Sequence, residues 1–383
     1  MGWSRSRGSP RSVGVVLIAT LTLAACGDGS QDSTEPGGAD EADPSVERFI
    51  DQALPEGASG SLVAAREGEM VHCEGFGMAD REARVAAACD TAYDIQSMTK
   101  QFTAAAILKL EMMGELRVTD PISKFVGPVP DDKREITLHQ LLTHTAGLID
   151  GLGGDYTRLS RTDLVAGALE SKLRSPPGAE YHYSNLGYGL LAAIIERVSG
   201  MGYEAFLAEH LFAPAGMAQT GYVLPEWGPD QVAVEYDARG AAQGRPFDHP
   251  WADDGPYWNL RGNGGLLSTA RDMFRWHLAL EGDEVLDQGA KDKLFTPYVL
   301  EEEGGDSYYG YGWVVLRSDD HGRVVWHDGG NAWNFGVFTR LLDEEVMVFW
   351  VTNGYRDKEE GWNLYRLDPK LTQGVVDRVR DGN

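Results

Sequence analysis

Basic residues are scarce in this sequence, which has 34 Lys and Arg against 59 Asp and Glu over 383 residues and a formal net charge of −25. Nucleic-acid binders need a basic face to neutralise phosphates, so this balance excludes a nucleic-acid partner. Beyond the N-terminal segment, the sequence also lacks the run of roughly 18–20 apolar residues that spans a bilayer, which excludes a polytopic membrane protein. What is present, 42% hydrophobic residues with ten Trp, is enough to bury a large globular core.

The first 25 residues have the pattern of a targeting segment and not of a folded element. Three Arg and no acid precede a run of small apolar residues at 13–25. This is the layout of a secretory signal. The run ends in Leu-Ala-Ala-Cys26, which resembles a bacterial lipobox in which the cysteine receives lipid. The alternative is an ordinary signal peptide followed by a chance cysteine.

We expect residues 26–45 to be a lipidated Cys26 followed by a disordered acidic tether. Residues 27–45 contain six acids, no base and several Gly, Ser and Pro, and such a segment buries too little apolar surface to order itself. Removal of the three signal arginines takes the net charge from −25 to −28. Acyl chains on Cys26 would anchor a domain at 46–383 to a membrane, facing the periplasm or the cell exterior.

Cysteine is nearly absent, with three residues in all. If Cys26 carries lipid, Cys73 and Cys89 either form one disulfide across a short loop or are two unrelated buried small residues. The sequence has no C-x-x-C pair, no H-E-x-x-H motif and no cluster of His, so we expect no metal site.

The pattern along the folded part predicts strands at both ends and helices between them. Helices are predicted at 46–54, 97–113, 136–142, 162–174, 185–199, 201–217, 269–281, 285–295 and 366–380. Strands are predicted at 59–66, 68–78, 311–318, 323–328, 334–342 and 346–352, with an irregular segment at 225–260. We therefore predict an α+β fold: an antiparallel sheet built from both chain ends, flanked by helices, with an all-helical lobe inserted.

Ser97 and Lys100 form a Ser-x-x-Lys pair at the start of the helix predicted at 97–113. Residues i and i+3 share one helix face, so the Lys100 amine is expected to reach Ser97 Oγ. A serine needs such a base to act as a nucleophile, and the helix N-terminus favours a developing anion. The alternative is an N-capping serine beside a surface lysine.

Tyr183 and Asn185 follow a Pro-Pro-Gly break and open the next apolar helix. A tyrosine whose pKa is lowered by nearby cations can accept a proton and return it to a leaving group. An Asn amide can orient a lysine and bind a substrate carbonyl. The alternative is a core tyrosine and an N-capping asparagine.

His327, Gly329 and Gly330 lie at the end of an apolar strand in the run His-Asp-Gly-Gly. Glycines at a strand edge let a substrate backbone approach and offer an N–H group to an oxyanion. The alternative is a polar turn that closes a hairpin.

The order Ser-x-x-Lys, Tyr-x-Asn and His-x-Gly resembles the serine β-lactamase and penicillin-binding-protein superfamily. The similarity is greatest to the branch with class C β-lactamases, D-aminopeptidases, DD-carboxypeptidases and family VIII esterases, and it covers about residues 46–355. The segments 141–148 (Leu-Leu-Thr-His-Thr-Ala-Gly-Leu) and 264–272 also match that family. Thr143 and His144 in the first segment are interpreted as loop scaffolding.

The resemblance implies that Ser97 is the nucleophile of an acyl-enzyme and that Lys100 and Tyr183 shuttle its proton. It implies further that Asn185 orients Lys100 and the substrate. The backbone N–H groups of Ser97 and Gly330 would form the oxyanion hole. No metal or organic cofactor is needed for this chemistry.

The sequence departs from the β-lactamases of this branch at His327, where those enzymes have a Lys that holds the substrate carboxylate. A neutral His does this poorly near pH 7. We therefore expect a serine hydrolase of small esters or of D-amino-acid peptides and amides. The alternatives are a β-lactamase, a penicillin-binding DD-carboxypeptidase, or a silent binding protein on the same scaffold. A second departure is Trp333, which either narrows the acyl pocket or only caps the sheet.

Overall fold

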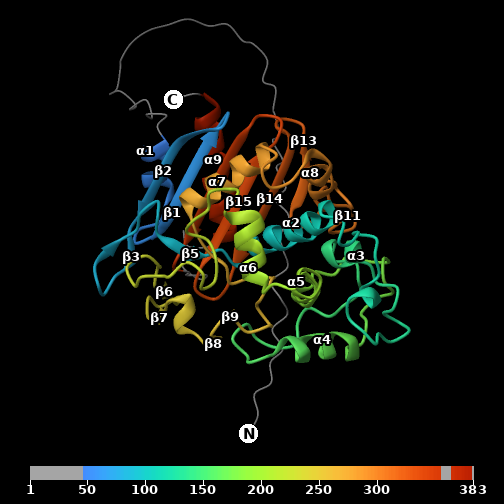
Figure 1. The fold of residues 1–383 in the computed structure, drawn as a ribbon. Helices are drawn as coiled ribbons and strands as arrows, with labels where there is room; N and C mark the ends of the chain where they lie inside the picture. Colours follow the sequence, from blue (N-terminus) through green and yellow to red (C-terminus); the bar gives the residue numbers. More distant parts are fainter. Residues whose placement is uncertain (1–45, 355–363, 382–383) are drawn as a thin grey trace, which may run out of the picture.

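The computed structural model describes residues 46–354 and 364–381. The predicted signal, Cys26 and tether lie outside the described residues. The central element is an eight-stranded antiparallel sheet with the strand order β11-β12-β13-β14-β15-β16-β1-β2 (Figure 1). Its strands are β1 Gly60–Arg66, β2 Glu69–Phe76, β11 Val299–Leu300, β12 Tyr308–Tyr309, β13 Val314–Ser318, β14 Gly322–Gly330, β15 Phe335–Leu341 and β16 Val346–Thr352.

Helices cover the sheet and form the lobe inserted between β5 and β10. The α-helices are α1 Val46–Ala53, α2 Thr99–Met112, α3 Leu138–Leu142, α4 Arg161–Glu170, α5 Asn185–Ser199, α6 Tyr203–Leu207, α7 Ala270–Glu281, α8 Gln288–Leu294 and α9 Leu364–Asp381. Short helical turns are η1 Gln96–Met98, η2 Ile122–Lys124, the π-helical η3 Ala208–Phe212 and η4 Pro246–Asp248. The remaining strands form two-residue and three-residue pairs: β3 Met78–Asp80 with β4 Val85–Ala86, β5 Ala92–Asp94 with β10 Leu267–Thr269, β6 Glu235–Tyr236 with β7 Ala242–Gly244, and β8 Trp251–Ala252 with β9 Gly255–Pro256.

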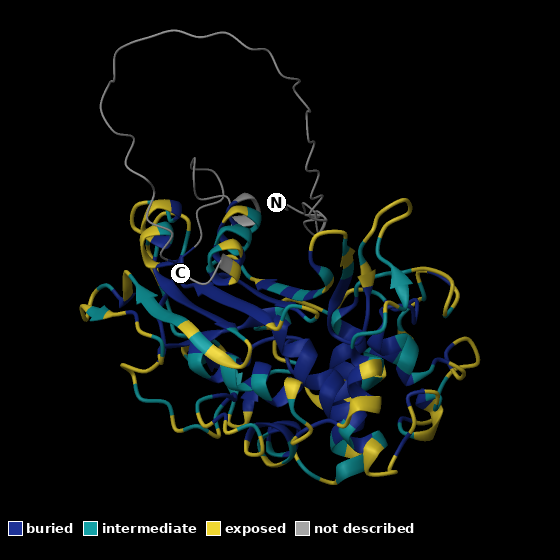
Figure 2. Ribbon diagram, turned by 90° about the horizontal axis from the view of Figure 1, so that it is seen from above, coloured by how far each residue is buried: buried dark blue, intermediate teal, exposed yellow. Residues whose placement is uncertain are grey.

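The first and last strands of the sheet in chain order, β1 and β16, lie side by side near the edge strand β2 and pair from Gly60↔Thr352 to Arg66↔Val346. Every residue of β15 and β16 is buried, because both faces of the sheet are covered (Figure 2). Alternation sends Leu62 toward α1 and α9 and Val63 toward the core around α2 and α7. The α+β fold with a sheet from both chain ends is confirmed.

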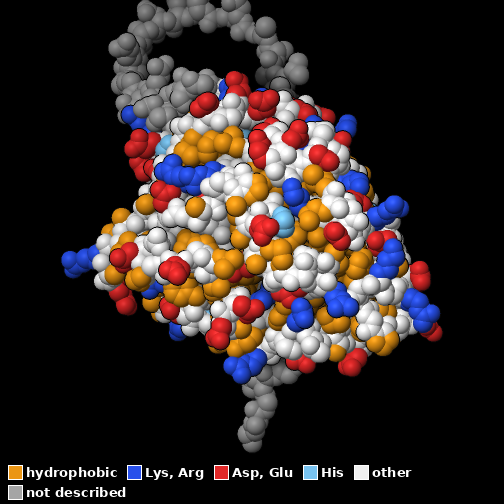
Figure 3. Space-filling view, in the orientation of Figure 1, with side chains coloured by type: hydrophobic (Ala, Val, Ile, Leu, Met, Phe, Trp, Pro, Cys, Tyr) orange, Lys and Arg blue, Asp and Glu red, His pale blue; other side chains and the backbone are white. Residues whose placement is uncertain are grey.

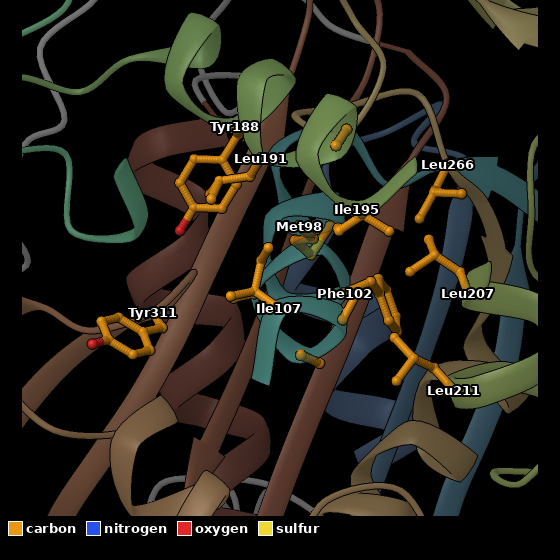
Figure 4. Packing of buried hydrophobic residues seen from close by; sticks show 14 of the residues in the cluster. Met98, Phe102, Ile107, Tyr188, Leu191, Ile195, Leu207, Leu211, Leu266 and Tyr311 are labelled. Carbon is orange, nitrogen blue, oxygen red and sulfur yellow. The ribbon is translucent and has the colours of Figure 1, made fainter. Parts of the chain in front are cut away.

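Helix α2 lies at the centre of the larger core. Its residues from Thr99 to Leu108 are all buried, the polar ones Thr99, Lys100, Gln101 and Thr103 included. Phe102 and Ile107 of α2 and Met98 of η1 pack against side chains of α5 and of the α6–η3 region (Figure 4). This burial holds the start of α2 rigidly against the helical lobe.

One of the predicted helices needs correction. The helix predicted over 201–217 is shorter: α6 ends at Leu207 and continues as a π-helix only to Phe212. Pro214 follows and has no N–H to extend the hydrogen-bond ladder. The segment 225–260 is irregular as predicted, and none of its regular elements exceeds three residues.

Cys73 on β2 and Cys89 form a disulfide with a Cα–Cα distance of 5.8 Å. This decides between the two possibilities that the sequence left open. No helix in the described part of the chain combines the length and apolar character needed to cross a bilayer. On the face shown in Figure 3, acidic and basic side chains are interspersed among apolar ones.

Candidate active site

Ser97 lies where the turn η1 runs into α2. The preceding residue, Gln96, has a backbone φ of +51°, a value that residues other than glycine rarely adopt. Asp94 holds this conformation, because its carboxylate accepts hydrogen bonds from Gln96 N (2.7 Å) and Gln96 Nε2 (2.6 Å). Within 91–100, Ser97 is the one residue that is not fully buried. The local structure therefore presents this serine at the edge of an otherwise buried segment.

Lys100 is one turn further along and is fully buried. Its Nζ donates to Ser97 Oγ at 3.1 Å and to the carbonyl oxygen of Asn263 at 2.7 Å. The same Nζ lies 4.8 Å from the centroid of the Tyr183 ring. The i, i+3 contact predicted from the sequence is confirmed, and Ser97, Lys100 and Tyr183 are brought together.

The Lys100 amine has an unusual proton affinity for a lysine. Burial lowers the pKa of Lys100 to about 7, because the charged form loses its hydration, while the carboxylates of Asp150, Asp155 and Asp328 act in the opposite direction. Near neutral pH a large fraction of Lys100 is therefore unprotonated and able to accept a proton.

Tyr183 precedes α5 and is packed against the ring of His144, with 4.3 Å between centroids. Burial raises the pKa of Tyr183 well above its usual range, and Asp328 raises it further, although a hydrogen bond with Ser97 lowers it. This direction is opposite to the lowered pKa expected for a proton-accepting tyrosine. The reason is that Tyr183 faces a carboxylate and several neutral rings in a dry site.

His327 on β14 is 2% exposed and makes two hydrogen bonds that define its tautomer. Its Nδ1 contacts the carbonyl oxygen of Asp328, which only accepts, so Nδ1 carries the hydrogen. Nε2 then accepts from the hydroxyl of Tyr309 at 3.0 Å. Burial lowers the pKa of His327 to about 3, and the charge of Lys100 lowers it further, so the ring is neutral.

Gly329 is the point where β14 passes closest to the serine turn. A Cβ at this position would lie 2.8 Å from the backbone nitrogen of Ser97, which real side chains do not tolerate. Gly330 follows at the exposed end of the strand, paired with Phe335 of β15. Gly329 thus allows β14 and the serine turn to approach closely. The predicted role of the two glycines toward a substrate stays a prediction.

Asn185 is the first residue of α5, but it is not the residue that holds Lys100 in this structure. The Lys100 amine donates instead to the carbonyl oxygen of Asn263, 163 residues away in the sequence. Asn185 Oδ1 has no hydrogen-bond partner within the described residues. Ser184, not Asn185, caps α5 by accepting from Gly187 N at 3.1 Å.

His144 and Tyr309 support the site, and only the first was noticed in the sequence. His144 Nδ1 accepts from the backbone N–H of Ser184 at 3.0 Å, and its ring lies 4.6 Å from that of Tyr309. Thr143 Oγ1 donates to the carbonyl oxygen of His139 within its own turn. These contacts confirm the scaffolding interpretation. No local pattern marks Tyr309, because its role comes from the contact of its hydroxyl with His327, two strands away in the sheet.

Trp333 joins three separate segments beside the site. Its ring stacks on His249, with 4.6 Å between centroids, and lies 5.9 Å from Tyr156. Its backbone N–H donates to Asn331 Oδ1 at 2.6 Å. The tryptophan therefore fastens the irregular 225–260 segment to the turn between β14 and β15.

No group of three or more His, Cys, Asp or Glu with metal-binding geometry occurs in the part of the chain that the structure describes. The arrangement instead joins an accessible hydroxyl, a buried amine and a neutral phenol. Together with a sheet built from both chain ends, this arrangement of side chains is that of the serine β-lactamase and penicillin-binding-protein superfamily.

The chain belongs to the Beta-lactamase family, whose model matches residues 46–368. It is 32% identical over 259 residues to the putative penicillin-binding protein PbpX of Bacillus subtilis (strain 168), an alignment that covers 68% of this chain and 62% of that relative. A penicillin-binding protein homologue from Pyrococcus abyssi, described as octameric, is similar in structure with a TM-score of 0.71 at 28% identity, covering 85% of this chain and 77% of that one.

The D-amino acid amidase from Ochrobactrum anthropi SV3, in complex with D-phenylalanine, has the same fold, with a TM-score of 0.73 at 21% identity. That match covers 88% of this chain and 99% of the amidase. The family is one of serine hydrolases, and the fold prediction and the family resemblance are both confirmed.

Proposed function

We propose that the protein is a serine hydrolase in which Ser97 forms an acyl-enzyme with a small ester or amide. The contact of 3.1 Å between Lys100 Nζ and Ser97 Oγ carries this proposal, because it joins the hydroxyl to a base of matched pKa. Neutral Lys100 takes the Ser97 proton as Oγ attacks the substrate carbonyl carbon. The backbone N–H groups of Ser97 and Gly330 would receive the developing oxyanion.

Tyr183 is suited to donating the proton that the leaving group needs. Its raised pKa keeps the phenol protonated, so it can donate a proton to the leaving alcohol or amine. Protonated Lys100 then restores the Tyr183 proton. Water later attacks the acyl carbonyl, and the proton that it loses passes through Lys100 to Ser97 Oγ. Asn185 Oδ1, which has no partner among the residues that the structure describes, can accept from an N–H of the substrate.

The charges around Lys100 favour substrates without a carboxylate near the scissile bond. His327 is neutral, so it supplies no cation for such a group. Asp150, Asp155 and Asp328 act on Lys100 as negative charges. Coulomb repulsion would disfavour a β-lactam or a C-terminal D-alanyl peptide, and the same field would attract a substrate amine. Neutral esters and D-amino-acid amides with a free amine are the proposed substrates.

A fluorophosphonate probe and three substrates test this function on the full chain. We expect the probe to label the wild type but not Ser97→Ala. Ser160→Ala, which changes another serine at a helix N-terminus, should be labelled like the wild type. Hydrolysis of p-nitrophenyl acetate and D-alanine amide should exceed that of nitrocefin by at least about 100-fold in kcat/KM. Unchanged labelling of Ser97→Ala, or faster turnover of nitrocefin, would contradict the proposal.

A further inference from the structure

A cavity lies on the sheet away from Ser97, between helices α7 and α8 and strands β13 to β15. Its volume is about 430 Å³. Its charged lining residues are Lys291, Arg317, Arg323 and Arg340 against Glu281 and Asp292. The lining therefore has two more cations than acids, in a chain whose net charge is −25. Side chains such as Leu280 and Phe295 provide an apolar wall.

The arginines lie on one face of the sheet because of its register. Arg317 of β13 is directly opposite Arg323 of β14, and Val325, two residues further on, is opposite Arg340 of β15. Side chains two apart on a strand point to the same face. Like charges directly opposite each other destabilise a sheet, so this pairing needs a counter-charge.

The protein itself supplies only part of that counter-charge. Asp343 accepts from the Nη2 of Arg323 at 3.2 Å. The Arg317 side chain makes no direct hydrogen bond or ion pair with any residue in 46–354 or 364–381, although its charge helps to lower the pKa of Asp343. Lys291 Nζ, in contrast, has three oxygen acceptors between 2.8 and 3.3 Å.

Arg340 also lines this cavity, and one of its guanidinium nitrogens lacks a partner among the described residues. It is 1% exposed, its Nε donates to His277 Nδ1 at 3.0 Å, and its Nη2 is paired with Glu281. Its Nη1 is buried without a hydrogen-bond partner among the described residues. An unpaired buried guanidinium nitrogen is unfavourable in the absence of an acceptor, so it favours a ligand that brings one.

We propose that this cavity binds the phosphate group of a small organic anion whose apolar part lies on the wall formed by Leu280 and Phe295. A phosphate monoester carries close to two negative charges at neutral pH, and it would add counter-charge beside Arg317 and Arg323, which have Asp343 as their shared acidic neighbour. Guanidinium groups fit its oxygens bidentately. The same group can come from a soluble phosphate ester or from an anionic lipid headgroup.

This site is separate from the proposed hydrolytic site. None of the residues lining the cavity is Ser97, Lys100, Tyr183 or His327. Arg323 lies four residues before His327 on β14, which at ~3.3 Å per residue places them about 13 Å apart. Binding at the cavity can therefore be lost without removing any group from the reacting atoms.

Isothermal titration calorimetry of the full chain with phenyl phosphate tests the proposal. We expect saturable binding that is tighter than for inorganic phosphate, that is absent for phenol and that weakens as salt is added. Arg317→Glu should weaken binding at least about tenfold. Arg239→Glu is the matched control, because Arg239 is an exposed arginine outside the cavity and the substitution changes the net charge by the same amount. Its affinity should equal that of the wild type.

A second arm distinguishes the sources of the phosphate. Vesicles that contain phosphatidic acid, whose headgroup is a phosphate monoester, and vesicles of phosphatidylcholine alone are sedimented with the wild type and with Arg317→Glu. Retention on the phosphatidic acid vesicles alone, lost in Arg317→Glu, assigns a lipid headgroup. Binding of phenyl phosphate without retention assigns a soluble ester. The proposal is overturned if the wild type neither binds phenyl phosphate nor is retained on the anionic vesicles. It is also overturned if Arg317→Glu, with a wild-type melting temperature, binds as tightly as the wild type.

Discussion

Lys100 and Tyr183 are buried in the same site, and burial makes each of them less charged. An uncharged amine accepts a proton, whereas an uncharged phenol donates one, so the same desolvation prepares a base and an acid. Sequence reasoning assigned both residues to proton transfer but could not divide the roles. Their pKa values depend on the surrounding rings and carboxylates, which come from distant segments.

The acid limb of the pH profile follows from Lys100. The active form is the neutral amine, and its pKa is about 7, so kcat/KM should fall about tenfold per pH unit as the pH drops below that value. Tyr183→Phe should lower kcat without moving the midpoint of this limb. The measurement is kcat/KM for p-nitrophenyl acetate from about pH 5 to about pH 9.

Asp328→Asn supplies the control for this assignment. Asp328 raises the pKa of Lys100, so its removal should move the midpoint to lower pH. The pKa of Asp328 itself is raised to about 6, chiefly by burial, and this carboxyl is the competing group in that range. Disappearance of the limb in Asp328→Asn would assign it to the carboxyl, and a shift of the midpoint in Tyr183→Phe would assign it to the phenol.

At the scale of elements, the start of α5 shows how one cap positions a functional side chain. Ser184 accepts from Gly187 N and donates from Oγ to the carbonyl oxygen of Ile149 at 2.7 Å. Tyr183 is its immediate neighbour, so the cap fixes the direction in which the chain enters the helix. The sequence suggested Asn185 as a cap, because Ser and Asn are both favoured N-caps and only geometry decides between them.

Ser184→Ala and Ser160→Ala form a matched pair. Both serines cap a helix through a backbone N–H at 3.1 Å, and each substitution should lower the free energy of unfolding by about 1 kcal/mol. Only Ser184→Ala should also lower kcat, because α4 and its cap contribute no residue to the proposed mechanism. Urea denaturation and steady-state kinetics check both effects. Equal kcat values for the two variants would show that the cap does not position Tyr183.

At the scale of the whole molecule, one face of the sheet carries the candidate active site and the other packs against the terminal helices. The face toward α2 and α7 carries His327 and the larger core, whereas the opposite face is covered by α1 and α9. Trp350 of β16 links the sheet to α9 by donating from Nε1 to Thr372 Oγ1 at 3.0 Å. We therefore expect stability and chemistry to be separable by face.

Leu371→Ala tests this separation. Leu371 of α9 is fully buried in the second core, and truncating a buried leucine costs about 2–5 kcal/mol. Stability to urea should fall by that amount, whereas kcat/KM at a temperature where the variant is folded should remain that of the wild type. A parallel loss of kcat/KM in fully folded protein would show that the two faces are coupled.

The sequence by itself determined the α+β architecture and the grouping of Ser97 and Lys100, because periodicity and helical spacing act over short distances. The family followed from the resemblance of its motifs to those of known relatives. Lipidation of Cys26 stays a prediction. Only the tertiary structure decided that Cys73 pairs with Cys89, that the Asn263 carbonyl holds Lys100 and that Tyr309 meets His327. These contacts join segments that are distant in the chain, and the dry environment that shifts each pKa exists only once those segments pack together.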